Sequence, residues 1–185
     1  MSMEIIEQFQ AKYPDVVEET HNHRGDATVR VKPDSWLQVF GFLKEEAGFD
    51  QWIDLTAADY LGREEGLPRF EVVVHLRRMK DGARIRVKAR LAGPSPSIDT
   101  LSGVYKGANW MERECHEMYG IVFKGSPDLR PLLLYPEFKG FPLRKDYPID
   151  QRQPRVPLLG SEVRRYSKAP DDTPHGHLAA EKKNV

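Results

Sequence analysis

Apolar residues near the N-terminus recur at helical spacing. They are Ile5, Ile6, Phe9 and Tyr13, which lie one, three and four residues apart. Residues at this spacing share one face of an α-helix. Pro14 follows, and the residue before a proline is disfavoured in helical backbone. The pattern predicts a short amphipathic helix that ends before Pro14.

Two short strands are expected next, over residues 16–20 and 27–32, on either side of the polar turn HNHRGD. Apolar and polar residues alternate in the second, which is typical of a strand with one buried face. The segment PDSWLQVFGFLKEEAG then predicts a helix with Pro33 in its first turn, Asp34 near the positive end of the helix dipole and Gly48 as a left-handed cap. Its core-facing stripe comprises Trp36, Val39, Phe40, Leu43 and Ala47.

A strand over residues 52–57 and then a hairpin around the turn MKDGA are expected. The inward positions of the hairpin are Phe70, Val72, Val74 and Leu76 on one strand and Ile85, Val87, Ala89 and Leu91 on the other. A symmetric register places Arg84, Arg86, Lys88 and Arg90 outward, opposite Glu71, Val73, His75 and Arg77. This stripe suits a docking surface, but we favour a solvated face that discourages edge pairing.

Two further helices are expected after the break GPSPS. The first spans residues 98–105. The second is NWMERECHEMYG, with Asn109 as N-cap, Glu112 completing a capping box and Gly120 at its end. Its buried face comprises Met111, Cys115, Met118 and Tyr119.

Beyond Gly120 the chain becomes rich in proline. Nine of the 14 prolines lie between Pro127 and Pro174, interleaved with large aromatic residues. Proline at this density prevents long helices and interior strands, while aromatic residues are unusual in a solvated linker. We therefore expect a globular domain over residues 1–122 and an extended docking arm over residues 123–185, with a mobile end.

Charge and cysteine content narrow the function. The 28 basic and 28 acidic residues cancel, so no overall field attracts nucleic acid or an anionic membrane. No apolar run approaches the ~20 residues that span a bilayer, and no signal peptide is evident. Cys115 is the single cysteine, which excludes internal disulfides and an iron–sulfur cluster held by this chain alone.

Reactive side chains do not combine into a catalytic site. Cys115 and His116 are adjacent on a helix and point about 100° apart, so the thiol cannot share a proton with the imidazole. Glu112 and His116 lie one turn apart but lack a second pair of metal ligands. Glycine-rich phosphate loops are missing as well. Arg144, Lys145 and Asp146 form a charged cluster between prolines, which suits either salt bridges to another subunit or a solvated turn.

Three motifs follow one another between Trp110 and Ile149: ERECHEMYGIVFKG, PDLRPLLL and FPLRKDYPI. Their succession resembles the signature of the C-subunit family of respiratory NADH:quinone oxidoreductase (complex I), and the resemblance covers most of residues 49–150. The chain departs from that pattern at Ser126, Pro131 and Phe141, where relatives commonly carry histidine, arginine, and histidine or tyrosine.

The resemblance implies an α+β fold of order α-β-β-α-β-β-β plus helices: a two-layer sandwich of a mixed, mostly antiparallel sheet with helices, followed by the proline-rich arm. It implies a protein without catalytic residues or cofactor, while FMN and iron–sulfur clusters belong to partner subunits. The expected partners are other complex I subunits, chiefly the hydrogenase-like large subunit and the iron–sulfur subunits of the peripheral arm. The expected place is peripheral, on the cytoplasmic side of the bacterial inner membrane.

Nine matching positions are expected at partner interfaces: Glu112, Arg113, Glu114, Glu117, Arg130, Arg144, Lys145, Asp146 and Tyr147. Three alternatives stay open. One is the equivalent subunit of a membrane-bound hydrogenase or of a dehydrogenase with another donor. A second is a stand-alone enzyme that uses Glu112, His116 and Glu117. The third is nucleic-acid binding through the stripe from Arg84 to Arg90, which lacks the usual wide basic footprint.

Overall fold

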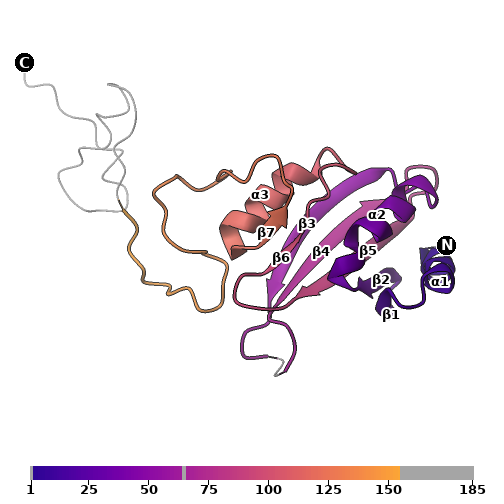
Figure 1. Cartoon of the computed structure of the whole chain (residues 1–185), viewed down its shortest axis with the longest axis horizontal. Helices are drawn as coiled ribbons and strands as arrows, with labels where there is room; N and C mark the ends of the chain where they lie inside the picture. The colour runs from indigo at the N-terminus through magenta and orange to yellow at the C-terminus, as the bar shows by residue number, and fades with distance from the viewer. Residues whose placement is uncertain (1, 64–65, 155–185) are drawn as a thin grey trace, which may run out of the picture. The chain divides into compact units, whose positions relative to one another are not determined.

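The computed structural model describes residues 2–63 and 66–154, and the expected mobile end lies outside them. The elements run in the order α1 (Ser2–Lys12), β1 (Val17–His23), β2 (Asp26–Val31), a 3-10 turn η1 (Pro33–Ser35), α2 (Trp36–Glu45), β3 (Gln51–Asp59), β4 (Phe70–Arg77), β5 (Arg84–Leu91), β6 (Ser97–Asp99), α3 (Ala108–Tyr119) and β7 (Val122–Lys124) (Figure 1). Three helices and a mixed sheet confirm the expected α+β class.

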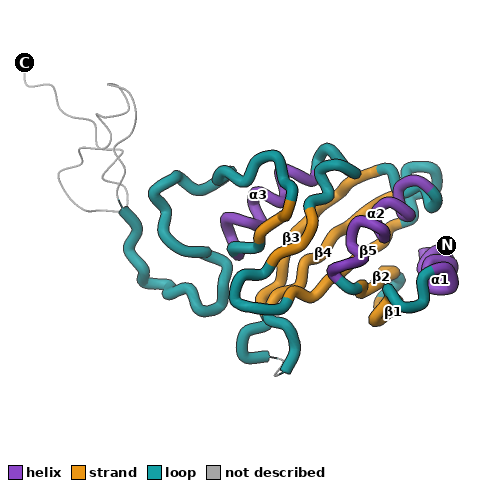
Figure 2. Tube along the Cα trace, in the orientation of Figure 1, coloured by secondary structure: helices purple, strands orange, loops and turns teal. Residues whose placement is uncertain are grey.

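Five strands form the main sheet in the order β1-β2-β5-β4-β3 (Figure 2). β2 and β5 run parallel, and every other neighbouring pair runs antiparallel. The β4–β5 register runs from Phe70 opposite Leu91 to Arg77 opposite Arg84, which confirms the prediction of a register symmetric about the turn. β6 and β7 form a separate parallel pair.

The apolar face of the main sheet is covered by α1 and α2. Val72, Val74 and Val87 are fully buried on this face, and Val39 and Leu43 of α2 share a contact region with Ile5, Ile6 and Phe9 of α1. Burial of such a side chain contributes about 1.5–3 kcal/mol. Phe42, which the expected stripe omitted, is also buried because α1 brings Phe9 to 5.0 Å between ring centroids.

Several local expectations are corrected. β1 continues to His23, so the turn HNHRGD contracts to Arg24 and Gly25, both with positive φ. The helix expected over residues 98–105 is wrong. Its first residues form β6, where Ile98 lies opposite Phe123 of β7. Pairing with a strand 25 residues away decides the conformation here. The sequence of a short segment does not reveal such a distant partner.

The capping box expected at the start of α3 is also wrong. The helix begins at Ala108 after Gly107, and no side chain caps it. Asn109 instead donates to Ser126 Oγ and to the Asp128 carbonyl, both at 3.1 Å. Gly120 ends the helix in the left-handed region, with φ 74°, as expected.

Residues 2–136 and 140–149 belong to one compact unit, and residues 137–139 and 150–154 belong to a second. In the second unit Lys139 and Gln153 are joined by two hydrogen bonds of 2.9 Å: the Lys139 amide donates to Gln153 Oε1, and Gln153 Nε2 donates to the Lys139 carbonyl. The predicted boundary after residue 122 falls within β7. Across residues 2–63 and 66–154, no helix combines the length and apolar character needed to cross a bilayer.

Candidate docking site

Asp59, at the end of β3, is a buried carboxylate that organises the site. Arg69 donates to it twice, from Nε to Oδ1 at 2.8 Å and from Nη2 to Oδ2 at 2.6 Å. The amide of Lys145, 86 residues away, donates to Oδ2 at 2.8 Å. Burial raises the pKa of Asp59, but these donors together with the Leu61 amide outweigh it and lower the pKa to about 2. The Asp59 carboxylate is therefore ionised and ties the motif PLRKDYP to the sheet.

Arg69 extends this contact to the same motif. Its guanidinium also donates to both carboxylate oxygens of Asp146, at 2.7 and 3.0 Å. Asp146 thus forms its ion pair within the chain. Asp59, Arg69 and Asp146 form one network, because bidentate bonds on both sides of a planar guanidinium fix its orientation.

Arg144 closes the C-terminal end of α3. Its Nε donates to the Tyr119 carbonyl at 2.6 Å. Its guanidinium lies over the rings of Phe141 and Phe70, at 4.3 and 5.1 Å from their centroids. A cation suits the negative end of a helix dipole. Arg144 therefore holds the motif against both α3 and β4.

Gly120 makes this close approach possible. A Cβ at this position would lie 2.7 Å from the Phe141 ring and would also clash with Arg144. The backbone is left-handed there, so a side chain would be strained as well. Two separate constraints thus require glycine.

Glu117 holds a second loop. Its carboxylate accepts bonds from three consecutive amides, those of Leu132 and Leu133 at 2.9 Å and that of Leu134 at 3.2 Å. The Glu117 side chain is buried, whereas that of Leu133 is 64% exposed. The carboxylate therefore binds the loop by its backbone and leaves the leucine side chain facing outward.

Arg113 binds the preceding turn. Its Nε and Nη2 donate to the carbonyls of Arg130 and Pro131, each at 2.9 Å. Its guanidinium also lies 5.3 Å from the ring centroid of Trp110, which is 56% exposed. Arg130 itself points outward and pairs with Asp128 at 2.9 Å. Hydrogen bonds with Arg113 and Glu117 of α3 thus hold residues 128–134 against the helix.

Glu112 points into the core. It is fully buried and accepts bonds from the Leu101 amide and from Thr100 Oγ1, both at 2.6 Å. Burial raises the pKa of this carboxyl even though both donors oppose the rise. A carboxylate on the core side of α3 therefore fixes the loop that follows β6.

The residues of the enzyme alternative bind different parts of this chain. His116 Nδ1 lies 2.8 Å from the Ile121 carbonyl, while Glu112 and Glu117 bind separate loops. Burial raises the pKa of the Cys115 thiol far above neutrality, which keeps it protonated and unreactive. In the described residues, no group of three or more His, Cys, Asp or Glu side chains is placed to hold a metal ion.

The predicted interface residues therefore differ in their surroundings. Glu112, Arg113, Glu117 and Arg144 are buried or partly buried and bind groups of this chain. Arg130 and Asp146 are exposed but form ion pairs within the chain, Lys145 is exposed, and Glu114 and Tyr147 are partly exposed. Sequence reasoning missed Asp59 and Arg69. A charged residue at a core-facing position of a strand is the signal that could have drawn attention to Asp59.

Exposed apolar side chains lie on α3 and on the loops that it holds. Trp110, Leu133 and Leu143 are 56%, 64% and 50% exposed, and Ile149 is fully exposed. The Leu143 amide donates to the Met118 carbonyl of α3 at 3.2 Å, so this leucine is also held beside the helix. Exposed leucines on loops that the chain itself holds in place are candidates for contact with a partner.

The fold and site define a mixed α+β protein in which the charged side chains of one helix and one strand end hold irregular loops that carry apolar residues outward. A family model described as "Respiratory-chain NADH dehydrogenase, 30 Kd subunit" matches residues 29–153. The chain belongs to this family, as the three motifs predicted.

Curated relatives agree with the family model. The NADH-quinone oxidoreductase C subunit of Geobacter metallireducens is 42% identical over 158 residues, covering 85% of this chain and 93% of the relative. The C subunit of Roseiflexus sp. is 37% identical over 168 residues, covering 90% and 94%. This chain is accordingly a subunit of the NADH:quinone oxidoreductase complex and a component of its peripheral arm.

Two solved structures share the fold. The trypsin-resistant fragment of Nqo5 gives a TM-score of 0.61 at 28% identity and covers 70% of this chain and 100% of the fragment. A chain of the membrane-bound sulfane sulfur reductase, an archaeal respiratory membrane complex, gives a TM-score of 0.66 at 26% identity, with 80% and 85% covered.

Gly120→Ala tests the close packing at the end of α3. We expect a loss of unfolding free energy of about 3 kcal/mol or more, since the methyl group must displace Arg144 and Phe141. Gly125→Ala is the matched control, because Gly125 is also left-handed but its added Cβ meets only Thr100 at 3.5 Å. The control should lose about 1 kcal/mol in urea unfolding. Equal losses would contradict the packing described.

Asp59→Asn tests the buried carboxylate through its pH dependence. Because the pKa of Asp59 is lower in the folded chain than in the unfolded chain, its ionised carboxylate stabilises the folded chain at pH values above the unfolded pKa. This contribution is lost as the pH falls from about 4 to about 2. We expect the stability difference between the unsubstituted chain and Asp59→Asn to shrink by roughly 2 kcal/mol over that range. Urea unfolding at several pH values measures it, with exposed Asp15→Asn as control. A difference independent of pH would show that Asp59 is not the paired carboxylate.

Proposed function

We propose that this chain is a non-redox scaffold of the peripheral arm, whose segment from Phe123 onward docks on neighbouring subunits and supports electron transfer from NADH to quinone. The observation that carries the proposal is the pair of exposed leucines, Leu133 and Leu143, on loops that Glu117 and Asp59 hold in place, together with the exposed Trp110 of α3. Loops fixed before binding lose less conformational entropy when a partner covers them.

The partners we infer are the hydrogenase-like large subunit and the iron–sulfur subunits of the arm. A relative from Bdellovibrio bacteriovorus supports the first of them. It is named as the C/D subunit of NADH-quinone oxidoreductase, and 70% of this chain aligns to 22% of it at 43% identity. Two subunits joined in one polypeptide are held close together, which favours direct contact between their separate forms.

We further propose that FMN and the iron–sulfur clusters reside in those partners and that this protein lies on the cytoplasmic side of the inner membrane. The single cysteine supports the first part, because a cluster normally takes several thiolates. Cys115 is buried and its neighbours on α3 are engaged in holding loops. We therefore infer that this chain contributes contacts to its partners and carries no redox group.

Leu133→Asp tests the docking surface without disturbing its support, because Glu117 binds the backbone at this position and not the side chain. We expect the fraction of the chain assembled into the complex to fall about tenfold or more, since a buried unpaired charge costs more than 1.4 kcal/mol at an interface. NADH:quinone activity of membranes should fall in proportion.

Leu37→Asp on α2 is the matched control, since Leu37 is 43% exposed and lies on a different helix from the one that holds the loops. Assembly is measured by affinity purification from the native membrane with quantification of co-purifying subunits. Both isolated variants should unfold near the stability of the unsubstituted chain. Normal assembly of Leu133→Asp, or equal losses in both variants, would reject this surface.

A further inference from the structure

The sheet face opposite α1 and α2 is rich in basic residues, and one buried carboxylate neutralises only part of it. Glu71 is fully buried there and accepts bonds from Arg30 at 2.9 Å, Lys88 at 3.0 Å and the hydroxyl of Tyr60 at 3.0 Å. Arg90 lies 3.5 Å from the same carboxylate. The end of β4 and β5 nearest Glu71 is therefore paired within the chain.

The other end of the same two strands is different. Arg77 lies directly opposite Arg84 across the antiparallel ladder, and like charges in that position repel. Within the part of the chain that the structure describes, neither guanidinium has an ion pair, and Arg77 Nε is buried without a hydrogen-bond partner. The fold thus maintains an unfavourable pair of cations at this point.

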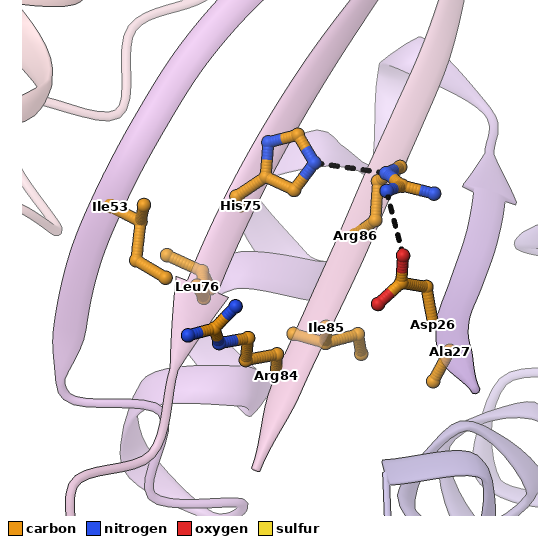
Figure 3. Close-up of a pocket in the computed structure, with 8 residues that line it drawn as sticks. All are labelled: Asp26, Ala27, Ile53, His75, Leu76, Arg84, Ile85 and Arg86. Atoms are coloured by element: carbon orange, nitrogen blue, oxygen red, sulfur yellow. Dashed lines mark hydrogen bonds and ion pairs between the residues drawn. The ribbon is translucent and has the colours of Figure 1, made fainter. Parts of the chain in front are cut away.

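Arg84 is one of the residues that line a hollow of about 250 Å³ (Figure 3). The Arg84 side chain extends from β5 toward the end of β4 and toward Ile53 of β3, which is 41% exposed (Figure 3). On the other side Arg86 donates to His75 Nε2 at 2.9 Å and lies 3.4 Å from the Asp26 carboxylate. Arg86 is therefore engaged, and Arg84 is the cation left for a ligand.

The hollow favours a ligand with one negative charge and a short aliphatic part. Its volume falls below the ~300–1,000 Å³ of small-molecule and cofactor pockets. Ile53 offers an apolar wall beside the guanidinium, and Asp26 disfavours a multiply charged phosphate by repulsion. A carboxylate side chain meets these conditions, because its methylene groups can pack on Ile53 while its oxygens bind Arg84 in bidentate fashion.

We propose that this hollow binds an aspartate or glutamate side chain of a neighbouring protein subunit, with Arg84 as its ion-pair partner. The proposal rests on the proposed function, since such a neighbour is present only in an assembly. It gives the outward stripe from Arg84 to Arg90 two roles: the Glu71 end is paired internally, and the turn end is a second docking site. The repulsion between Arg77 and Arg84 is relieved when the partner carboxylate arrives.

Arg84→Lys, followed by carbodiimide treatment of the purified complex, identifies the occupant. This reagent joins an amine to a carboxylate in direct contact, and lysine keeps the charge. We expect mass spectrometry to find position 84 joined to an acidic residue of another subunit. The Lys12–Glu46 pair, 2.7 Å apart, is the internal control that must also be joined.

A cross-link from position 84 only to carboxylates of this chain, whether Asp26 or those of residues 155–185, would overturn the proposal. So would no cross-link there when Lys12 and Glu46 are joined, which is the result expected if lipid headgroups or phosphate occupy the hollow. Failure of the unsubstituted chain to co-purify with other subunits would instead contradict the proposed function itself. The two failures are therefore distinguishable.

Arg84→Glu supplies an independent test in the complex and in the isolated chain. It should weaken assembly about tenfold, yet raise the Tm of the isolated chain, because it replaces the repulsion with Arg77 by attraction. Lys80→Glu changes the same charge in the exposed turn of the same hairpin and should leave assembly within about twofold. Unchanged assembly of Arg84→Glu, or a parallel loss of Tm and assembly, would overturn the proposal.

Discussion

Buried carboxylates that accept backbone amides are the interaction on which the rest of this structure depends. Residues 125–149 form no helix or strand, so their amides find few partners in regular secondary structure. Asp59 and Glu117 supply acceptors for four of them, at Lys145 and at Leu132 to Leu134. A hydrogen bond to a charged group contributes about 1.5–3 kcal/mol, and here each carboxylate receives several. The irregular stretches that contain residues 132–134 and 145 are thereby held in one conformation.

This arrangement explains why the signature motifs are dense in charge although, among the residues that the structure describes, no group of three or more His, Cys, Asp or Glu side chains is placed to hold a metal ion. Arg113 and Arg144 donate hydrogen bonds to backbone carbonyls, and Glu117 accepts hydrogen bonds from backbone amides. The apolar residues on those loops are left facing outward, where a partner can cover them. In our proposal, the charged residues determine the shape of the docking surface and the leucines supply much of the binding free energy. The basic hollow beside Arg84 then adds a contact of a different chemical kind on the opposite face of the sheet.

Local pattern was sufficient for much of the fold. A register symmetric about the turn predicted the pairing of β4 and β5 to the residue. The alternation supports it, because a shift of one position would turn every apolar side chain away from the core. Gly120 was recognised as a helix end from its type alone. The pattern failed at residues 98–105, where pairing of Ile98 with Phe123 decides the conformation, and at Glu112, where burial against Leu101 replaces the expected cap. The Asp59 network joins residues 86 positions apart, so no local spacing could reveal it.

Amide hydrogen exchange in the full-length chain tests most directly whether buried carboxylates fix the irregular loops. The amides of Leu132, Leu133, Leu134 and Lys145 should exchange at least about tenfold more slowly than that of Lys80 in the exposed hairpin turn. Glu117→Gln should speed exchange at the three leucines and spare Lys145, whereas Asp59→Asn should do the reverse. Exchange at all four amides as fast as at Lys80, in the unsubstituted chain, would contradict the structure's central interaction.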